Sequence, residues 1–225
     1  MLFLVLGKGK TGSLVAEVAR ERGHSVRVYD VTENPHAAAL IAPNLAGVDA
    51  VIDFTTPEAA LENMRAVLAL GGRIVVGTTG WYAQVDEMKA LAGKRGGGLL
   101  YGTNFSIGVQ KLFRLTAALA ELEGYEFSIE ETHHTSKLDA PSGTALTLKQ
   151  IIQSVRPEAE VPVLAHRVGD ANGEHIVRAA SEHDELELRH DAHSRRGFAL
   201  GAVRGAEWLT GKSGAWEFRD IFEQL

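Results

Sequence analysis

Short apolar runs alternate with longer amphipathic segments along residues 1–104. The runs are rich in valine, isoleucine and leucine, which is typical of strands buried on both faces. This order predicts βαβ units and an α/β domain with a doubly wound parallel sheet of the Rossmann type. The predicted strands are Leu2–Leu6, Val26–Asp30, Ala50–Phe54, Arg73–Val76 and Leu99–Tyr101, and the predicted helices are Gly12–Arg22, Pro57–Leu70 and Ala83–Lys94.

The pattern changes after Asn104. A helix over residues 106–122 is followed by four strand-like segments and one further long helix, Gly143–Val155. Three of the segments alternate polar and apolar residues, as strands of a half-exposed antiparallel sheet do. The sequence therefore predicts a second, α+β domain over residues 106–198. Its predicted strands are Glu126–Glu131, Val161–Val168, Glu174–Ala180 and Glu185–Asp191.

The C-terminal segment is expected to return to the first domain. Phe198–Leu209 has the pattern of a helix rich in alanine and glycine, and the apolar segment Trp216–Ile221 follows it. We therefore expect the first domain to comprise residues 1–105 completed by residues 199–225.

The composition narrows the class of protein. With 225 residues, of which 45% are hydrophobic and 23% charged, the chain is typical of soluble globular proteins. No apolar run approaches the roughly 20 residues that span a bilayer, and Leu2–Leu6 lacks the features of a signal peptide, so we expect a cytoplasmic protein without a membrane partner. A net charge of −6 argues against a nucleic-acid partner. The absence of cysteine excludes thiol nucleophiles and disulfides.

A glycine-rich loop follows the first predicted strand and opens a helix, as a dinucleotide-binding motif requires. Gly7 permits the tight turn, Gly9 lets the backbone approach a pyrophosphate, and Gly12 lets the helix pack closely on the strand. An ordinary tight turn is the alternative, whereas a P-loop is excluded because no glycine stands five residues before Gly9. The candidate cofactor contacts in this loop are Gly7, Lys8, Gly9, Lys10, Thr11 and Gly12.

Asp30 stands at the end of the second predicted strand, where a carboxylate accepts hydrogen bonds from ribose hydroxyl groups. It repels a 2′-phosphate and favours NADH, but Lys8 and Lys10 are placed to bind such a phosphate, so NADPH remains an alternative. Aspartate capping a turn is the other interpretation of Asp30. Two later strand-end loops offer further cofactor contacts, namely Gly77, Thr78 and Thr79, and Gly102, Thr103, Asn104 and Phe105.

The segment Glu130–Ala145 concentrates groups that exchange protons and bind anions. His133 and His134 follow a predicted strand, and histidine donates and accepts protons near neutral pH. Lys137 carries a compact charge that binds a carboxylate or donates a proton. Ser142 begins a helix, and Gly143 and Thr144 present N–H groups at its N-terminus, which suits an anion. These groups fit a substrate with carboxylates.

The histidine pair has two other interpretations. His133 and His134 become metal ligands if Asp139 or the later His190 and His193 complete the set, but Lys137 places an ammonium group beside such a metal and no H-E-x-x-H spacing occurs. We therefore expect no metal. Histidines in a surface loop are the other alternative.

The segment Glu130–Ala145 resembles the signature E-x-x-H-H-x-x-K-x-D-A-P-S-G-T-A of the bacterial dihydrodipicolinate reductase family. Further pieces of the resemblance occur in order along essentially the whole chain, at Asp53–Pro57, Gly77–Gly80, Asn104–Ser106 and Arg195–Ala202. Three departures concern the cofactor side: the glycine loop is one residue shorter than usual and has Lys10 for an arginine, no basic residue follows Asp30, and Gly102-Thr103 replaces Ala-Pro.

The resemblance implies a dinucleotide-binding domain, a substrate-binding and oligomerisation domain, and a homotetramer. It implies that His133 exchanges the proton, that Lys137 binds substrate and shares the proton role, and that His134, Gly143 and Thr144 hold the substrate carboxylates. We therefore predict NADH- or NADPH-dependent reduction of the dehydrated form of 4-hydroxy-tetrahydrodipicolinate, a cyclic dicarboxylate, to tetrahydrodipicolinate in lysine and diaminopimelate biosynthesis. The alternatives are a non-catalytic NAD(H) sensor and a metal-dependent hydrolase.

Overall fold

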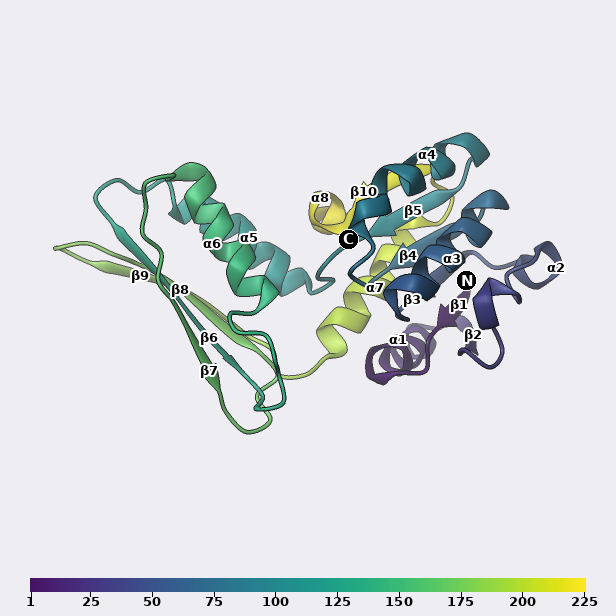
Figure 1. Ribbon diagram of the computed structural model, residues 1–225, viewed down its shortest axis with the longest axis horizontal. Helices are drawn as coiled ribbons and strands as arrows, with labels where there is room; N and C mark the ends of the chain where they lie inside the picture. The colour runs from purple at the N-terminus through teal and green to yellow at the C-terminus, as the bar shows by residue number, and fades with distance from the viewer. The chain divides into compact units, whose positions relative to one another are not determined.

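The computed structural model describes residues 1–225, which divide into two compact units (Figure 1). The first unit comprises Met1–Ser106 together with Arg196–Leu225, and the second comprises Ile107–Arg195. No helix is both long enough and apolar enough to cross a membrane.

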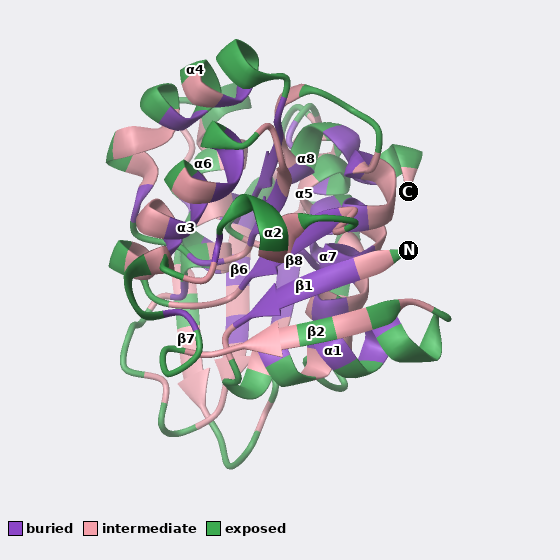
Figure 2. Cartoon of the chain, turned by 90° about the vertical axis from the view of Figure 1, so that its right-hand side faces the viewer, coloured by how far each residue is buried: buried purple, intermediate pink, exposed green.

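The first unit is built on six parallel strands in the order β10-β5-β4-β3-β1-β2. The central strands are continuous apolar runs because helices cover both faces, whereas β2 at the edge is partly exposed (Figure 2). This arrangement confirms the predicted doubly wound fold. The strands are β1 (Leu2–Leu6), β2 (Ser25–Tyr29), β3 (Ala50–Asp53), β4 (Arg73–Val76), β5 (Gly98–Tyr101) and β10 (Gly214–Glu217).

Two pairs of helices sandwich this sheet. The helices α1 (Lys10–Glu21) and α7 (Arg196–Leu209) pack together on one face, and α3 (Pro57–Ala69) and α4 (Val85–Arg95) pack together on the other (Figure 1). Glycines bring α7 close to the sheet and to the loop after β5: a Cβ at Gly205 would lie 2.7 Å from Cδ2 of Leu100 in β5, and one at Gly201 would lie 1.8 Å from the carbonyl oxygen of Phe105. Short helices at α2 (Ala42–Leu45) and α8 (Phe218–Ile221) and three 3₁₀ turns complete the unit.

The limits of α3 follow from its sequence. The hydroxyl of Thr56 caps the helix by accepting a hydrogen bond from the N–H of Ala59, and Pro57 occupies the first helical position. Its buried face includes Ala60, Met64, Val67 and Leu68, which recur at the helical spacing. The helix ends at Ala69, and Gly71, which follows the capping residue Leu70, has a φ of +70°, a left-handed conformation that suits glycine.

The second unit has a mixed four-stranded sheet in the order β7-β6-β8-β9, covered on one face by α5 (Ile107–Leu119) and α6 (Gly143–Val155) (Figure 1). The expectation of an antiparallel sheet was wrong for one pair, since β6 and β7 run parallel. The chain crosses from β6 to β7 through α6, which is the kind of connection that a parallel pair requires. The strands are β6 (Glu126–His133), β7 (Val163–Arg167), β8 (Glu174–Ala180) and β9 (Glu185–Asp191).

Candidate active site

The glycine loop joins β1 to α1, and Gly9 is the residue that precedes the helix. Gly7 has a φ of +99°, and an added Cβ would lie 2.4 Å from the carbonyl oxygen of Phe54. A Cβ at Gly12 would lie 2.1 Å from the carbonyl oxygen of Gly7. Apart from the adjacent residues of the chain, no atom lies within 4 Å of a Cβ built at Gly9. The chain's own packing therefore requires Gly7 and Gly12, while the approach to the N-terminus of α1 at Gly9 is open, which fits a pyrophosphate.

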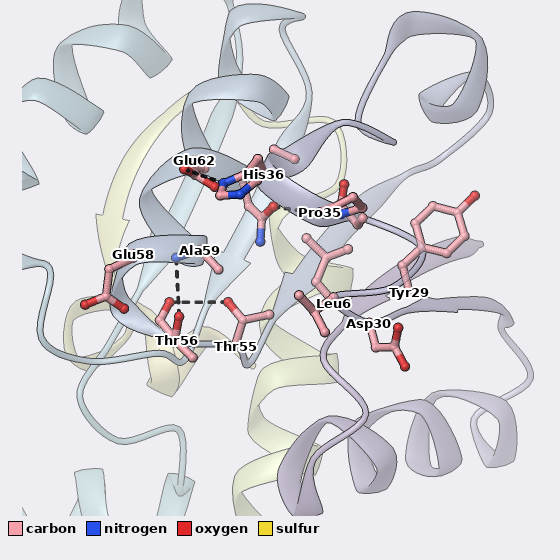
Figure 3. A pocket seen from close by; sticks show the side chains of 14 residues that line it. Leu6, Tyr29, Asp30, Pro35, His36, Thr55, Thr56, Glu58, Ala59 and Glu62 are labelled. Carbon is pink, nitrogen blue, oxygen red and sulfur yellow. Dashed lines mark hydrogen bonds and ion pairs between the residues drawn. The ribbon is translucent and has the colours of Figure 1, made fainter.

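A pocket of about 300 Å³ lies beside this loop, at the carboxyl ends of β1 and β2 (Figure 3). Its apolar wall includes Leu6 and Tyr29, and Asp30, Glu58 and Glu62 add carboxylates. Pockets at this edge of a parallel sheet are where doubly wound proteins bind ligands. The position and the acidic lining of the pocket fit the adenosine part of a dinucleotide.

Lys8 is engaged by two carboxylates. Its Nζ lies 2.6 Å from Oε1 of Glu33 and 3.4 Å from Oδ2 of Asp30. The carboxylate of Asp30 also accepts hydrogen bonds from the N–H and the hydroxyl of Thr32. The sequence interpretation missed Glu33, although its spacing of three residues from Asp30 was a usable signal. The charge of Lys8 is compensated within the protein.

The two later strand-end loops are shaped by aromatic side chains. A Cβ at Gly77 would lie 2.2 Å from Cε1 of Phe54, and one at Gly102 would lie 2.9 Å from Cβ of Phe218. Phe105 is buried and packs its ring 4.4 Å from that of Phe218. Among the other candidate contacts, Thr78 is buried, Asn104 accepts a hydrogen bond from the N–H of Ser106, and Thr79 and Thr103 are exposed.

Asp53, at the end of β3, is fully buried and links the loop that follows its own strand to the loop after β4 and to α3. Its Oδ1 accepts hydrogen bonds from the N–H and the hydroxyl of Thr55, at 3.0 and 2.7 Å, and from the hydroxyl of Thr78 at 3.0 Å. Its Oδ2 accepts one from Nδ2 of Asn63 at 2.7 Å, and Asn63 in turn accepts one from Nδ2 of Asn34 at 2.9 Å. Burial raises the pKa of Asp53, although these hydrogen bonds oppose the shift.

Replacement of Asp53 by asparagine is expected to destabilise the protein by about 2 kcal/mol. Both oxygens of Asp53 accept hydrogen bonds, so in either orientation the N–H₂ group of the new amide faces another hydrogen-bond donor. Urea unfolding of the full chain measures this loss. Asp170→Asn, at an exposed loop position, is the matched control. A loss below about 0.5 kcal/mol, the usual size of a surface effect, would show that the network around Asp53 relaxes freely.

In the second unit, sheet register gathers the proton-exchanging groups. His133 is the last residue of β6, its side chain is 11% exposed, and it pairs with Arg167 of β7. Two positions earlier, Glu131 pairs across the other side with His175 of β8. The rings of His133 and His175 have centroids 5.0 Å apart. Burial lowers the pKa of His133 and lowers that of His175 to about 4.

The other predicted substrate groups lie in the loop after β6 and at the start of α6. Nδ1 of His134 lies 2.7 Å from the hydroxyl of Ser136. Lys137 donates to both carboxylate oxygens of Asp139, at 2.7 and 2.9 Å, and thereby lowers the pKa of that carboxyl. Ser142 caps α6 by accepting from the N–H of Ala145, so that Gly143 and Thr144 form the first turn.

Two protein-family sequence models match the chain. Dihydrodipicolinate reductase, N-terminus, matches residues 1–105, and dihydrodipicolinate reductase, C-terminus, matches residues 108–222. The chain belongs to the dihydrodipicolinate reductase family. The resemblance carried by Glu130–Ala145 is thereby confirmed.

Two relatives in the family match over nearly their whole length. The chain is 36% identical over 242 residues to 4-hydroxy-tetrahydrodipicolinate reductase of Christiangramia forsetii, covering 100% of this chain and 99% of the relative. It is 39% identical to 4-hydroxy-tetrahydrodipicolinate reductase of Natronomonas pharaonis, covering 94% and 96%. A dipicolinate-bound dihydrodipicolinate reductase from Paenisporosarcina sp. TG-14 shares the fold, with a TM-score of 0.83 at 24% identity over 98% of this chain and 99% of that one.

The side chains whose metal-binding atoms lie close together are not the set that the sequence suggested for a metal site. His134 and Asp139 are engaged by Ser136 and Lys137. The donor atoms that lie within 4.8 Å of one another belong to Glu131, His133 and His175. The sequence interpretation missed Glu131 and His175, and the signal for Glu131 was a charged residue at an apolar position of an alternating strand.

Proposed function

We propose that this protein, like its family, is an NAD(P)H-dependent 4-hydroxy-tetrahydrodipicolinate reductase, with His133 as the proton donor and Lys137 as a substrate-binding residue. The observation that supports these roles best is the placement of His133, Lys137 and the N-terminus of α6 around one loop of the second unit. The family match along the whole chain supports the reaction.

The substrate is a cyclic dicarboxylate, and the loop offers two kinds of anion-binding group. The ammonium group of Lys137 is positioned by Asp139, and a substrate carboxylate competes for it as a charged acceptor. The N–H groups of Gly143 and Thr144, at the N-terminal end of α6, suit the second carboxylate. A Cβ built at Gly143 meets nothing within 4 Å, so the helix end is open there. His134 stands beside these groups and is proposed to hold a carboxylate with them.

The dinucleotide is proposed to lie along the loop Gly7–Gly12 and beside Asp30, and when bound it supplies the hydride. His133 supplies the accompanying proton. Its Nδ1 faces Glu131, so Nε2 is the nitrogen that exchanges the proton with substrate. A Cβ at Gly173 would lie 3.1 Å from that Nε2, so the glycine leaves room at the reacting atom.

The activity is tested by following NADH and NADPH oxidation in parallel, with substrate generated enzymatically from pyruvate and aspartate semialdehyde. Oxidation that depends on aspartate semialdehyde is the expected result. Cofactor binding without such oxidation would instead identify a non-catalytic NAD(H) sensor. Activity that chelator treatment abolishes and a divalent metal restores would favour a metal-dependent enzyme.

NADH is proposed as the preferred cofactor, because Asp30 and Glu33 repel a 2′-phosphate and engage Lys8, the neighbouring cation. We expect kcat/KM for NADH to exceed that for NADPH about tenfold, the scale of one unfavourable charge contact. Asp30→Asn is expected to reduce this ratio at least about threefold by improving the use of NADPH. The exposed Asp170→Asn variant is the control, and equal use of both cofactors by the unaltered enzyme would contradict the proposed preference.

A homotetramer built through the second unit is also proposed. In this unit α5 and α6 cover one face of the sheet, and Leu164, on the other face opposite Glu130, is 58% exposed. Light scattering of the full chain measures the mass, and a monomer at working concentration would contradict this assembly.

A further inference from the structure

Glu131 occupies a position where the strand pattern calls for an apolar residue. Along β6 the buried positions alternate through Phe127, Ile129 and Glu131. The first two belong to the apolar core of the second unit, whereas Glu131 brings a fully buried carboxylate to the same face. A buried carboxylate is costly unless hydrogen bonds and charges compensate it, so its partners indicate its role.

One oxygen of Glu131 is held firmly. Oε1 accepts a hydrogen bond from the N–H of Ser142 at 3.0 Å and another from Nη2 of Arg167 at 3.1 Å. Burial opposes ionisation, but these hydrogen bonds prevail and lower the pKa of Glu131. The carboxylate is therefore charged at neutral pH, and it is hydrogen-bonded directly to the backbone of Ser142, the residue that caps α6.

The other oxygen faces the two imidazoles. Oε2 lies 3.5 Å from Nδ1 of His133 and 3.7 Å from Nε2 of His175. Oε2 and Nδ1 of His133 are both buried and have no hydrogen-bond partner. A small rotation of the His133 ring would bring Nδ1 within hydrogen-bond distance of Oε2, as catalytic hydrogen bonds commonly tighten when substrate binds. His175 closes the other side, with Nε2 3.2 Å from the hydroxyl of Ser142.

We propose that Glu131 is a positioning residue, which orients His133 through Nδ1 and ties it to the carboxylate-binding end of α6 through Ser142. This inference rests on the proposed function, in which His133 donates the proton. Because Glu131 accepts at Nδ1, it selects the tautomer and ring orientation that leave Nε2 to the substrate, and it stabilises the imidazolium form.

A metal ion bound to the same atoms is less consistent with the surroundings. Arg167 already compensates the single carboxylate of Glu131, and Lys137 adds a second positive charge near His133. Asp139 in turn compensates Lys137, so a divalent cation would find no excess negative charge there, whereas a neutral imidazole that gains one proton adds a single charge next to the carboxylate of Glu131.

The proposal predicts the direction of a pH effect. Burial lowers the pKa of His133, Glu131 raises it, and Lys137 and Arg167 lower it further. Removing the charge of Glu131 therefore lowers this pKa again. Because the protonated imidazole is the donor, the high-pH limb of kcat/KM moves to lower pH. The charged and titratable groups around His133 are Glu131 on β6, Arg167 on β7, His175 on β8, and Lys137 and Asp139 in the loop. His190 on β9 acts in turn on His175.

The decisive experiment compares Glu131→Gln with Glu130→Gln, which removes the same charge from the adjacent, half-exposed residue paired with Arg178. Glutamine keeps the length of the side chain and an acceptor for Ser142. NMR titration of labelled histidines follows the His133 imidazole, whose signal is assigned by its loss in His133→Gln. In Glu131→Gln we expect the pKa of His133 and the pH limb to fall by about one unit and kcat to fall about tenfold.

Glu130→Gln is expected to change the pKa of His133 and kcat little. Glu131→Asp keeps the charge on a shorter arm, and it is expected to recover at least half of the pKa shift, which also provides a test if the glutamine variant folds poorly. An unchanged His133 pKa in Glu131→Gln, or an equal shift in Glu130→Gln, would overturn the positioning role. If the unaltered protein lacks reductase activity, the proposed function fails, while the titration still decides whether Glu131 controls His133.

Discussion

Replacement of His133 by glutamine is expected to lower kcat about 100-fold or more, the usual contribution of a positioned general acid. Glutamine retains a polar side chain of similar reach but has no group that releases a proton near neutral pH. The loop Gly7–Gly12 belongs to the other compact unit, so NADH affinity is expected to stay within about twofold of that of the unaltered enzyme. Steady-state kinetics and NADH fluorescence titration measure the two effects.

His193→Gln is the matched control for this substitution, since the side chain of His193 is 89% exposed. It is expected to leave kcat unchanged. Near-normal turnover of purified His133→Gln would remove His133 from the mechanism and transfer the proton role to Lys137. A parallel loss of NADH binding would instead indicate damage to the fold.

Replacement of Lys137 by alanine is expected to lower kcat/KM for the substrate about 100-fold, corresponding to about 3 kcal/mol for a lost charge-assisted contact. The ammonium group meets a carboxylate that is present before and after the reaction, so much of the loss is expected in KM. Asp139, which Lys137 engages at 2.7 Å, also loses its partner in this variant. Initial rates over a range of substrate concentrations separate KM from kcat.

Lys94→Ala, at an exposed position of α4, is the control for loss of a lysine charge. Two outcomes are informative beyond the expected one. A fall confined to kcat would show that Lys137 takes part in proton transfer, and an unchanged kcat/KM would exclude it from the substrate site.

The predicted strands of the first unit agree closely with β1 to β5 because strands buried on both faces are continuous apolar runs. The last strand, β10, was not separated from the apolar segment Trp216–Ile221. Gly214–Glu217 is short and half-buried, and it is a strand because it pairs in parallel with β5. A pairing with residues more than a hundred positions away leaves no periodic signal in a four-residue segment.

The parallel pairing of β6 with β7 escaped prediction for a related reason. Alternation of polar and apolar residues reports that one face of a strand is exposed, and it carries no information on strand direction. The helix α6 between the two strands was the available clue, since a crossover helix accompanies parallel neighbours.

The candidate site divides in the same way. His133, His134, Lys137 and Ser142 fall within ten consecutive residues, so their nearness was evident from the sequence. Arg167 and His175 come from other strands, and only the register of the sheet brings them to Glu131. Hydrogen bonds such as Arg167 to Glu131 depend on which residues stand opposite each other. A single sequence does not show the register of the sheet, so these hydrogen bonds could not be predicted from it.

The chain of hydrogen bonds from Asp53 through Asn63 to Asn34 has a consequence for redesign of the cofactor pocket. The loop after β2 is the natural place to exchange residues when NADH and NADPH specificity are to be switched. In this protein that loop cannot be exchanged independently of the rest of the unit. The side-chain amide of Asn34 donates a hydrogen bond to Asn63, and Asn63 donates one to the buried carboxylate of Asp53. A transplanted loop has to keep Asn34, or supply an equivalent donor to Asn63, if the new specificity is to come without loss of stability.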